Sequence, residues 1–159
     1  MIFELSIKDF ILIKEVVLKF DLGFNVLSGE TGAGKSMVLG AINVLLGGQA
    51  SKESVRIGAD KANIRASFLT DTTLNDLMVK NDIPTDDEVV VISREIQSKG
   101  KSISRVNGQV VTLSQLKLIM DKLINIHGQN EHQTLLESEH QRNLLDAYDY
   151  FHGFLLFQA

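Results

Sequence analysis

The chain contains no cysteine among its 159 residues, and this absence excludes several kinds of chemistry. Disulfide bonds, zinc–thiolate sites and cysteine nucleophiles are all ruled out, and the composition is compatible with a reducing compartment. No apolar run approaches the roughly 18 residues that span a bilayer. The first residues include Glu4, Lys8 and Asp9, which do not suit a secretory leader. We therefore expect a cytoplasmic protein with no membrane partner.

Positive charge is also scarce, because 16 Lys and Arg residues stand against 20 Asp and Glu residues and give a net charge of −4. This balance argues against a protein that coats nucleic acid through bulk electrostatics, so any contact with DNA must be local. The best local candidate is a basic set formed by Arg94, Lys99, Lys101 and Arg105. The alternative interpretation is an ordinary hairpin face whose charges are solvated.

One glycine-rich stretch carries the clearest chemical signal. It reads Gly29-Glu30-Thr31-Gly32-Ala33-Gly34-Lys35-Ser36 and matches the phosphate-binding loop G-x-x-x-x-G-K-[ST]. The apolar run 24–27 before the loop predicts a strand, and residues 36–46 after it predict a helix buried against a sheet. Strand, loop and helix thus occur in the order that a nucleotide-binding loop requires.

Each part of this loop has a physical role. Its glycines allow backbone angles at which successive N–H groups close on phosphate oxygens, and the helix N-terminus adds further donors and the positive end of its dipole. We expect Lys35 to reach the β- and γ-phosphates and the Ser36 hydroxyl to ligate Mg²⁺. The predicted cofactors are therefore ATP and Mg²⁺. The alternative is a plain glycine-rich turn with a solvated Lys35.

The remaining pattern predicts a single α/β domain. Further strands are predicted at 2–7, 11–20, 64–69, 88–96, 102–106 and 123–126, with a tight turn at Asn107-Gly108. Further helices are predicted at 74–80, from Thr112 or Ser114 to about Lys122, and from 137 onward. Gly47-Gly48 is expected to end the helix that follows the phosphate-binding loop.

A complete P-loop ATPase also needs an acidic residue at the end of an apolar strand to hold Mg²⁺. The strongest apolar strand, 89–92, ends instead in Ser93-Arg94, and Asp146 follows two leucines inside a predicted helix. No convincing metal-binding aspartate or catalytic glutamate follows a strand, and the signature sequence of ABC-type ATPases is absent. The sequence thus predicts half of an ATPase active site.

Three motifs together resemble the SMC-like branch of the ABC-type ATPases, in particular its bacterial DNA-repair members. They lie at Leu5–Ile13, Gly29–Ser36 and His127–Gln133. The resemblance implies a P-loop NTPase of the SMC head type: residues 1–136 form its N-terminal lobe, with a mixed sheet and the P-loop helix, and residues 137–159 begin a coiled coil. Asp9 stands where the family usually has Asn, so no adenine contact is assigned to it.

The resemblance also assigns roles to single residues. Lys35 and Gln129 are the expected catalytic residues, because Gln129 matches the Q-loop glutamine that ligates Mg²⁺ together with Ser36 and orients the attacking water. Arg56 resembles the family's R-loop arginine, which lies close to the phosphates. The alternatives are a glutamine in a polar loop and a plain surface arginine. A metal site at His127 and His132 is rejected, because the H-E-x-x-H arrangement is missing.

For function, the resemblance implies an ATPase head whose other half returns from elsewhere in a longer, nucleoid-associated bacterial protein. Two such heads would sandwich two ATP molecules and couple hydrolysis to DNA double-strand-break repair and recombination. The chain alone is expected to bind ATP weakly and hydrolyse it poorly. Two rivals stay open: a self-sufficient small P-loop NTPase or kinase, and a non-hydrolysing tethering module that uses the loop only for dimerisation.

Overall fold

The computed structural model describes residues 1–28, 34–86 and 88–124. All of them fall within one unit, Met1–Ile124. The helix predicted from residue 137 and the domain boundary predicted after residue 136 both lie outside the described residues. Of the strand predicted at 123–126, residues 125 and 126 also lie outside them, and the prediction is wrong for Leu123, which is the last residue of a helix.

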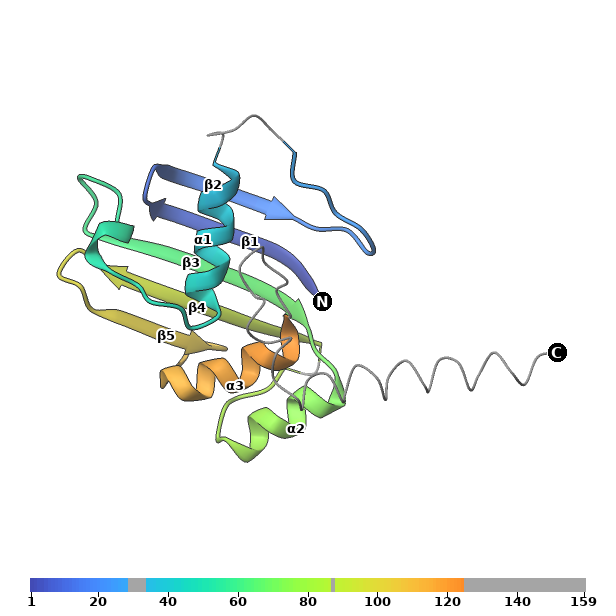
Figure 1. The fold of residues 1–159 in the computed structure, drawn as a ribbon. Helices are drawn as coiled ribbons and strands as arrows, with labels where there is room; N and C mark the ends of the chain where they lie inside the picture. Colours follow the sequence, from blue (N-terminus) through green and yellow to red (C-terminus); the bar gives the residue numbers. More distant parts are fainter. Residues whose placement is uncertain (29–33, 87, 125–159) are drawn as a thin grey trace, which may run out of the picture. The chain divides into compact units, whose positions relative to one another are not determined.

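A six-stranded sheet forms the body of this unit, and each strand runs antiparallel to its neighbours (Figure 1). Its strands, in spatial order, are β2 (Ile13–Lys19), β1 (Ile2–Phe10), β3 (Lys61–Leu69), β4 (Val89–Gln97), β5 (Ser102–Val106) and β6 (Gln109–Val111). The predictions of the first five are confirmed, with small shifts at their ends. The short β6 was not predicted, because three residues are too few to display a period of two.

The described residues also form three α-helices: α1 (Lys35–Leu45), α2 (Thr72–Lys80) and α3 (Leu113–Leu123). A short 3₁₀ helix, η1, covers Lys52–Ser54. Helices α1 and α3 lie over the same face of the sheet, and α2 lies beside α3 (Figure 1). Thr112, rather than Ser114, caps α3 in a capping box with Gln115. None of these helices is long and apolar enough to cross a bilayer.

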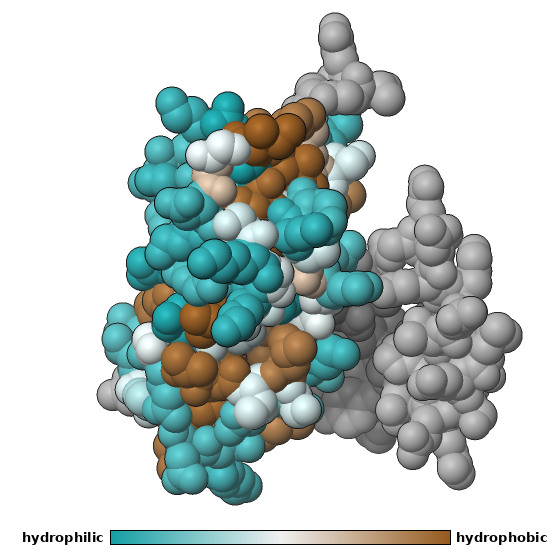
Figure 2. Space-filling model, turned by 90° about the vertical axis from the view of Figure 1, so that its left-hand side faces the viewer, coloured by the Kyte–Doolittle hydropathy of each residue, from teal (hydrophilic) through white to brown (hydrophobic). Residues whose placement is uncertain are grey.

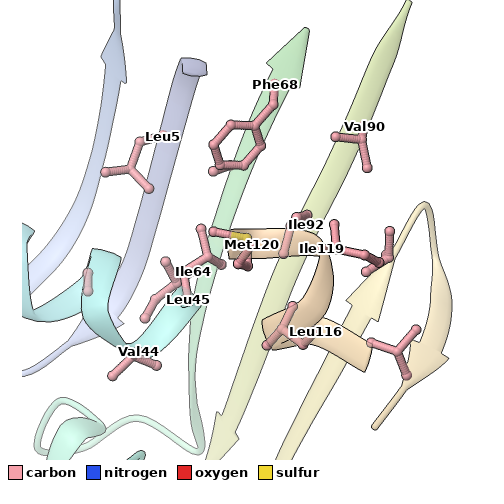
Figure 3. Packing of buried hydrophobic residues seen from close by; sticks show 14 of the residues in the cluster. Leu5, Val44, Leu45, Ile64, Phe68, Val90, Ile92, Leu116, Ile119 and Met120 are labelled. Carbon is pink, nitrogen blue, oxygen red and sulfur yellow. The ribbon is translucent and has the colours of Figure 1, made fainter. Parts of the chain in front are cut away.

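The hydrophobic core lies between the sheet and these helices. Alternate residues of the strands point toward the helices, as the period of two requires. Figure 3 shows this layer, whose labelled members are Leu5, Val44, Leu45, Ile64, Phe68, Val90, Ile92, Leu116, Ile119 and Met120. The core therefore fixes α1 against the middle of the sheet.

The prediction of a strand at 24–27 is wrong. Residues 20–28 form neither helix nor strand, and the side chain of Phe24 is 93% exposed. Asn25 instead closes a local turn, because its Nδ2 donates to the Asp21 carbonyl at 2.9 Å and its Oδ1 accepts from the Asp21 N–H at 3.1 Å. A strand needs a neighbour for its backbone groups, and none of the six strands pairs with this segment.

The end of α1 is confirmed at the glycine pair. Gly47 is left-handed, with φ 94°, and its N–H donates to the Val44 carbonyl at 3.1 Å. The N–H of Gly48 donates to the Asn43 carbonyl at 2.9 Å. These two bonds form a Schellman motif, which satisfies carbonyls that the helix end leaves without partners.

Two glycine-to-alanine substitutions are expected to shift stability in opposite directions. A Cβ at Gly48 would lie 2.6 Å from the backbone oxygen of Asn43, so we expect Gly48→Ala to lower the free energy of unfolding by about 1–3 kcal/mol. A Cβ at Gly40, inside α1, would meet only Phe10 among the described residues, at an ordinary 3.9 Å. Gly40→Ala should therefore raise the free energy by about 0.5–1 kcal/mol.

Urea denaturation followed by circular dichroism measures both changes. Equal midpoints for Gly48→Ala and the unmodified chain would contradict the helix end described here.

Candidate nucleotide-binding site

The N-terminus of α1 carries the part of the phosphate-loop motif that the structure describes. Gly34 is its N-cap, with φ 92° and ψ −4°, a left-handed conformation that favours glycine. Its carbonyl accepts from the N–H groups of Met37 and Val38, each at 3.0 Å. No side chain in the described residues caps this helix, and its first turn contains no acidic residue. The helix dipole and the first-turn N–H groups therefore favour an anion at this end.

Lys35 and Ser36 occupy the first turn of α1, as predicted. Lys35 is half-buried, and Ser36 is exposed. A cationic side chain and an open hydroxyl at a positive helix end fit a phosphate chain with its Mg²⁺. The other predicted loop residues, Gly29, Glu30, Thr31, Gly32 and Ala33, and the predicted Gln129 lie outside the described residues, so their contacts stay predictions.

Arg56 lies in a segment that is joined to the end of β1 and to the turn that follows it. Its N–H donates to the Asp9 carbonyl at 2.8 Å, and the Ile11 N–H donates to the Ser54 carbonyl at 2.9 Å. Asp9 and Ile11 both have φ 52°, which L-residues seldom adopt, so this turn is held in an unusual backbone conformation. The segment of Arg56 is thus attached to the first family motif through Asp9. A contact between the half-buried Arg56 and phosphate stays a prediction.

The prediction that Arg94 belongs to a basic set that contacts DNA is wrong. Its side chain is 2% exposed and lies on the face of β4 that packs against the helices. The cost of burying an unpaired charge is large, and hydrogen bonds to oxygen atoms reduce it. Arg94 alternates with the buried Ile92 and Ile96, and this period of two was the signal in the sequence that placed it inside.

The hydrogen bonds of Arg94 lead to the far end of α1. Its Nη1 donates to the carbonyls of Val44 and Gly48, both at 2.7 Å, and its Nη2 donates to the Ser102 hydroxyl at 2.9 Å. Burial lowers the pKa of Arg94 from its ordinary value. Sequence reasoning missed this link, because no pattern relates an arginine to carbonyls about 50 residues away.

The remaining basic residues lie elsewhere on the hairpin of β4 and β5. Lys99 and Lys101 are exposed at its turn, and Arg105 is half-buried on the sheet face opposite the helices. On that face, Lys61 Nζ lies 2.8 Å from Glu95 Oε2. The hydrogen bond from Lys61 holds the pKa of Glu95 below its usual value, and the positive charge of Arg105 adds to the shift. The candidate DNA surface is therefore reduced to the three residues Lys99, Lys101 and Arg105.

Comparison with known proteins identifies the family to which the chain belongs. The family described as AAA domain matches residues 4–152. The DNA repair protein RecN of Halalkalibacterium halodurans is 45% identical over 151 residues, and RecN of Bacillus subtilis is 43% identical over 150 residues. Each match covers 93% of this chain and 26% of the relative, so the chain spans about a quarter of the length of these relatives.

Solved structures show the same fold. A structure described as concerning ATP-driven dimerization and DNA-stimulated activation of SMC ATPases has a TM-score of 0.67 and 25% identity, covering 91% of this chain and 97% of that one. The Smc head domain from Pyrococcus furiosus, with an extended coiled coil and bound to the C-terminal domain of ScpA, has a TM-score of 0.61 and 27% identity, covering 76% of this chain and 32% of that one.

These likenesses confirm the predicted fold, the N-terminal lobe of an SMC-type ATPase head. The chain belongs to the AAA domain family, within which it resembles the RecN proteins over 93% of its own length.

Proposed function

We propose that this chain is the ATP-binding half of an SMC-like ATPase head that acts in bacterial DNA repair. The observation that carries the proposal is the start of α1, where the glycine-rich motif leads directly into an anion-favouring helix end with Lys35 and Ser36 in its first turn. The similarity to bacterial RecN DNA repair proteins and to SMC ATPases supports this role, which in our proposal is carried out on DNA in the bacterial cytoplasm.

In this proposal each residue of the site has a separate role in binding ATP and Mg²⁺. Backbone N–H groups from Gly29 to Gly34 surround the phosphates, and the Lys35 ammonium neutralises the charge on the β- and γ-phosphates. The Ser36 hydroxyl and the Gln129 amide oxygen would hold Mg²⁺, which would supply positive charge to neutralise the phosphates. Arg56 approaches the phosphates from the segment attached to Asp9.

Exposed apolar side chains support the existence of a second half of the head. Leu22 and Phe24 are 81% and 93% exposed on a segment without strand partners among the described residues, and Leu39 on α1 is 55% exposed. Figure 2 shows the left-hand side of the view in Figure 1, a different part of the surface, on which hydrophobic residues also gather in patches between hydrophilic regions. Apolar surface of this kind marks an interaction site. We propose that a C-terminal lobe covers it and brings the missing acidic residues, and that two complete heads then dimerise around ATP.

Lys35→Ala is expected to weaken Mg-ATP binding by more than about tenfold, because a charge-assisted hydrogen bond to phosphate contributes about 1.5–3 kcal/mol. Isothermal titration of the 159-residue chain with Mg-ATP measures this change. Lys80→Ala, which removes a lysine at the end of α2, is the matched control and should bind as the unmodified chain does. Equal affinities for Lys35→Ala and the unmodified chain would refute the nucleotide site.

Gln129→Ala is expected to leave Mg-ATP affinity near its original value and to slow hydrolysis in the assembled head. The reason is that the amide orients the attacking water, whereas the loop and Lys35 supply most of the binding. Titration and single-turnover hydrolysis of the assembled head separate the two effects. A large loss of affinity would instead make Gln129 mainly a structural residue.

The DNA contact proposed for the hairpin is tested by its dependence on salt. Replacing Lys99 and Lys101 by Gln should weaken DNA binding by the assembled head and reduce the slope of log affinity against log salt by roughly one for each phosphate that the protein no longer neutralises. Lys80 and Lys122, in the last turns of α2 and α3, provide a control with the same change in net charge. An unchanged slope in the hairpin variant would exclude this surface as a DNA contact.

A further inference from the structure

Arg94 is a buried cation that is not paired with an anion among the residues that the structure describes. It is one of the largest fully buried side chains, and its hydrogen-bond partners are two carbonyl oxygens and one hydroxyl. Its Nε is buried without a partner in the same part of the chain. A buried charge of this kind is costly, and a hydrophobic residue of similar volume often serves stability equally well. Stability alone therefore gives no reason for an arginine here.

The position of its partners suggests another reason. Val44 lies in the last turn of α1, and Gly48 is the last residue of the Schellman motif that ends this helix. The last turn of α1 contains no basic residue of its own. Arg94 therefore supplies, from β4, the positive charge that complements the negative end of the helix dipole. Its Nη2 also binds Ser102 on β5, so a single guanidinium connects α1 to two neighbouring strands.

The opposite end of the same helix carries Lys35 and Ser36. An 11-residue helix is about 16 Å long, so Arg94 does not reach the phosphates itself. The helix is rigid, however, and a displacement of one end is passed to the other. Its buried residues Ala41, Val44 and Leu45 are all apolar, and apolar packing is not directional. The directional bonds of Arg94 therefore add a constraint on the position of α1 along its own axis.

We propose that Arg94 is a positioning residue for the nucleotide site, holding the C-terminal end of α1 so that Gly34, Lys35 and Ser36 meet the phosphates in register. This inference rests on the proposed function of the loop. It also explains why an arginine interrupts the apolar face of β4, since its planar fork can bind several oxygens at once and a lysine cannot do so in the same geometry.

The test compares three variants of the 159-residue chain by titration with Mg-ATP. Arg94→Met removes the charge and the donors but keeps an apolar side chain, so the fold is expected to persist. Its dissociation constant should rise about fivefold or more, within the range of energetic coupling between distant sites. Arg94→Lys should recover part of the affinity, because it keeps the charge and at least one donor. Arg65→Met, on the exposed face of β3 opposite the helices, should bind as the unmodified chain does.

A purely structural role would lower the melting temperature of Arg94→Met and leave the dissociation constant of the folded protein unchanged, which would overturn the proposal. If Arg94→Met does not fold, Arg94→Lys decides: unmodified affinity in that variant would also overturn it, and intermediate affinity supports it. Lys35→Ala separates this inference from the proposed function. Weaker binding by Lys35→Ala together with unchanged binding by Arg94→Met would refute the positioning role alone, whereas unchanged binding by Lys35→Ala would refute the nucleotide site.

Discussion

The attachment of α1 to the sheet is the constraint on which the candidate site depends. The helix buries Ala41, Val44 and Leu45 against the strands, and the guanidinium of Arg94 binds its C-terminal carbonyls. The phosphate-loop residues begin at the other end of the same helix. A helix fixed in this way presents its first-turn donors and its positive dipole end at a defined place, which a site for a phosphate chain requires.

The surroundings of α1 support the proposal that the described unit provides half of an ATPase active site. One side of the helix is covered by the sheet and the other leaves Leu39 exposed, while Phe24 and its apolar neighbours have no strand to pair with among the described residues. The unpaired segment among the described residues and the lack of an acidic residue after an apolar strand in the sequence both support the proposal that a C-terminal lobe completes the site.

The sequence allowed much of the fold to be predicted, because most elements carry local signals. The alternation in β4, the Asn107-Gly108 turn and the glycine pair after α1 are all readable from neighbouring residues. The failures involve distant partners. Residues 24–27 have the composition of a strand, but a strand forms only where another strand can pair with it. Arg94 is charged, a property typical of a surface residue; its alternation with Ile92 and Ile96 was readable from the sequence, but its contact with α1 depends on the tertiary fold.

Single-turnover hydrolysis of Mg-ATP by the 159-residue chain, with Lys35→Ala as the blank, tests the central claim most directly. If the chain supplies the nucleotide-binding half of the site and lacks the catalytic acid, turnover should equal that of the blank. Turnover well above the blank, approaching the roughly 1 s⁻¹ of slow enzymes, would show that a complete active site is already present and would contradict the half-head account.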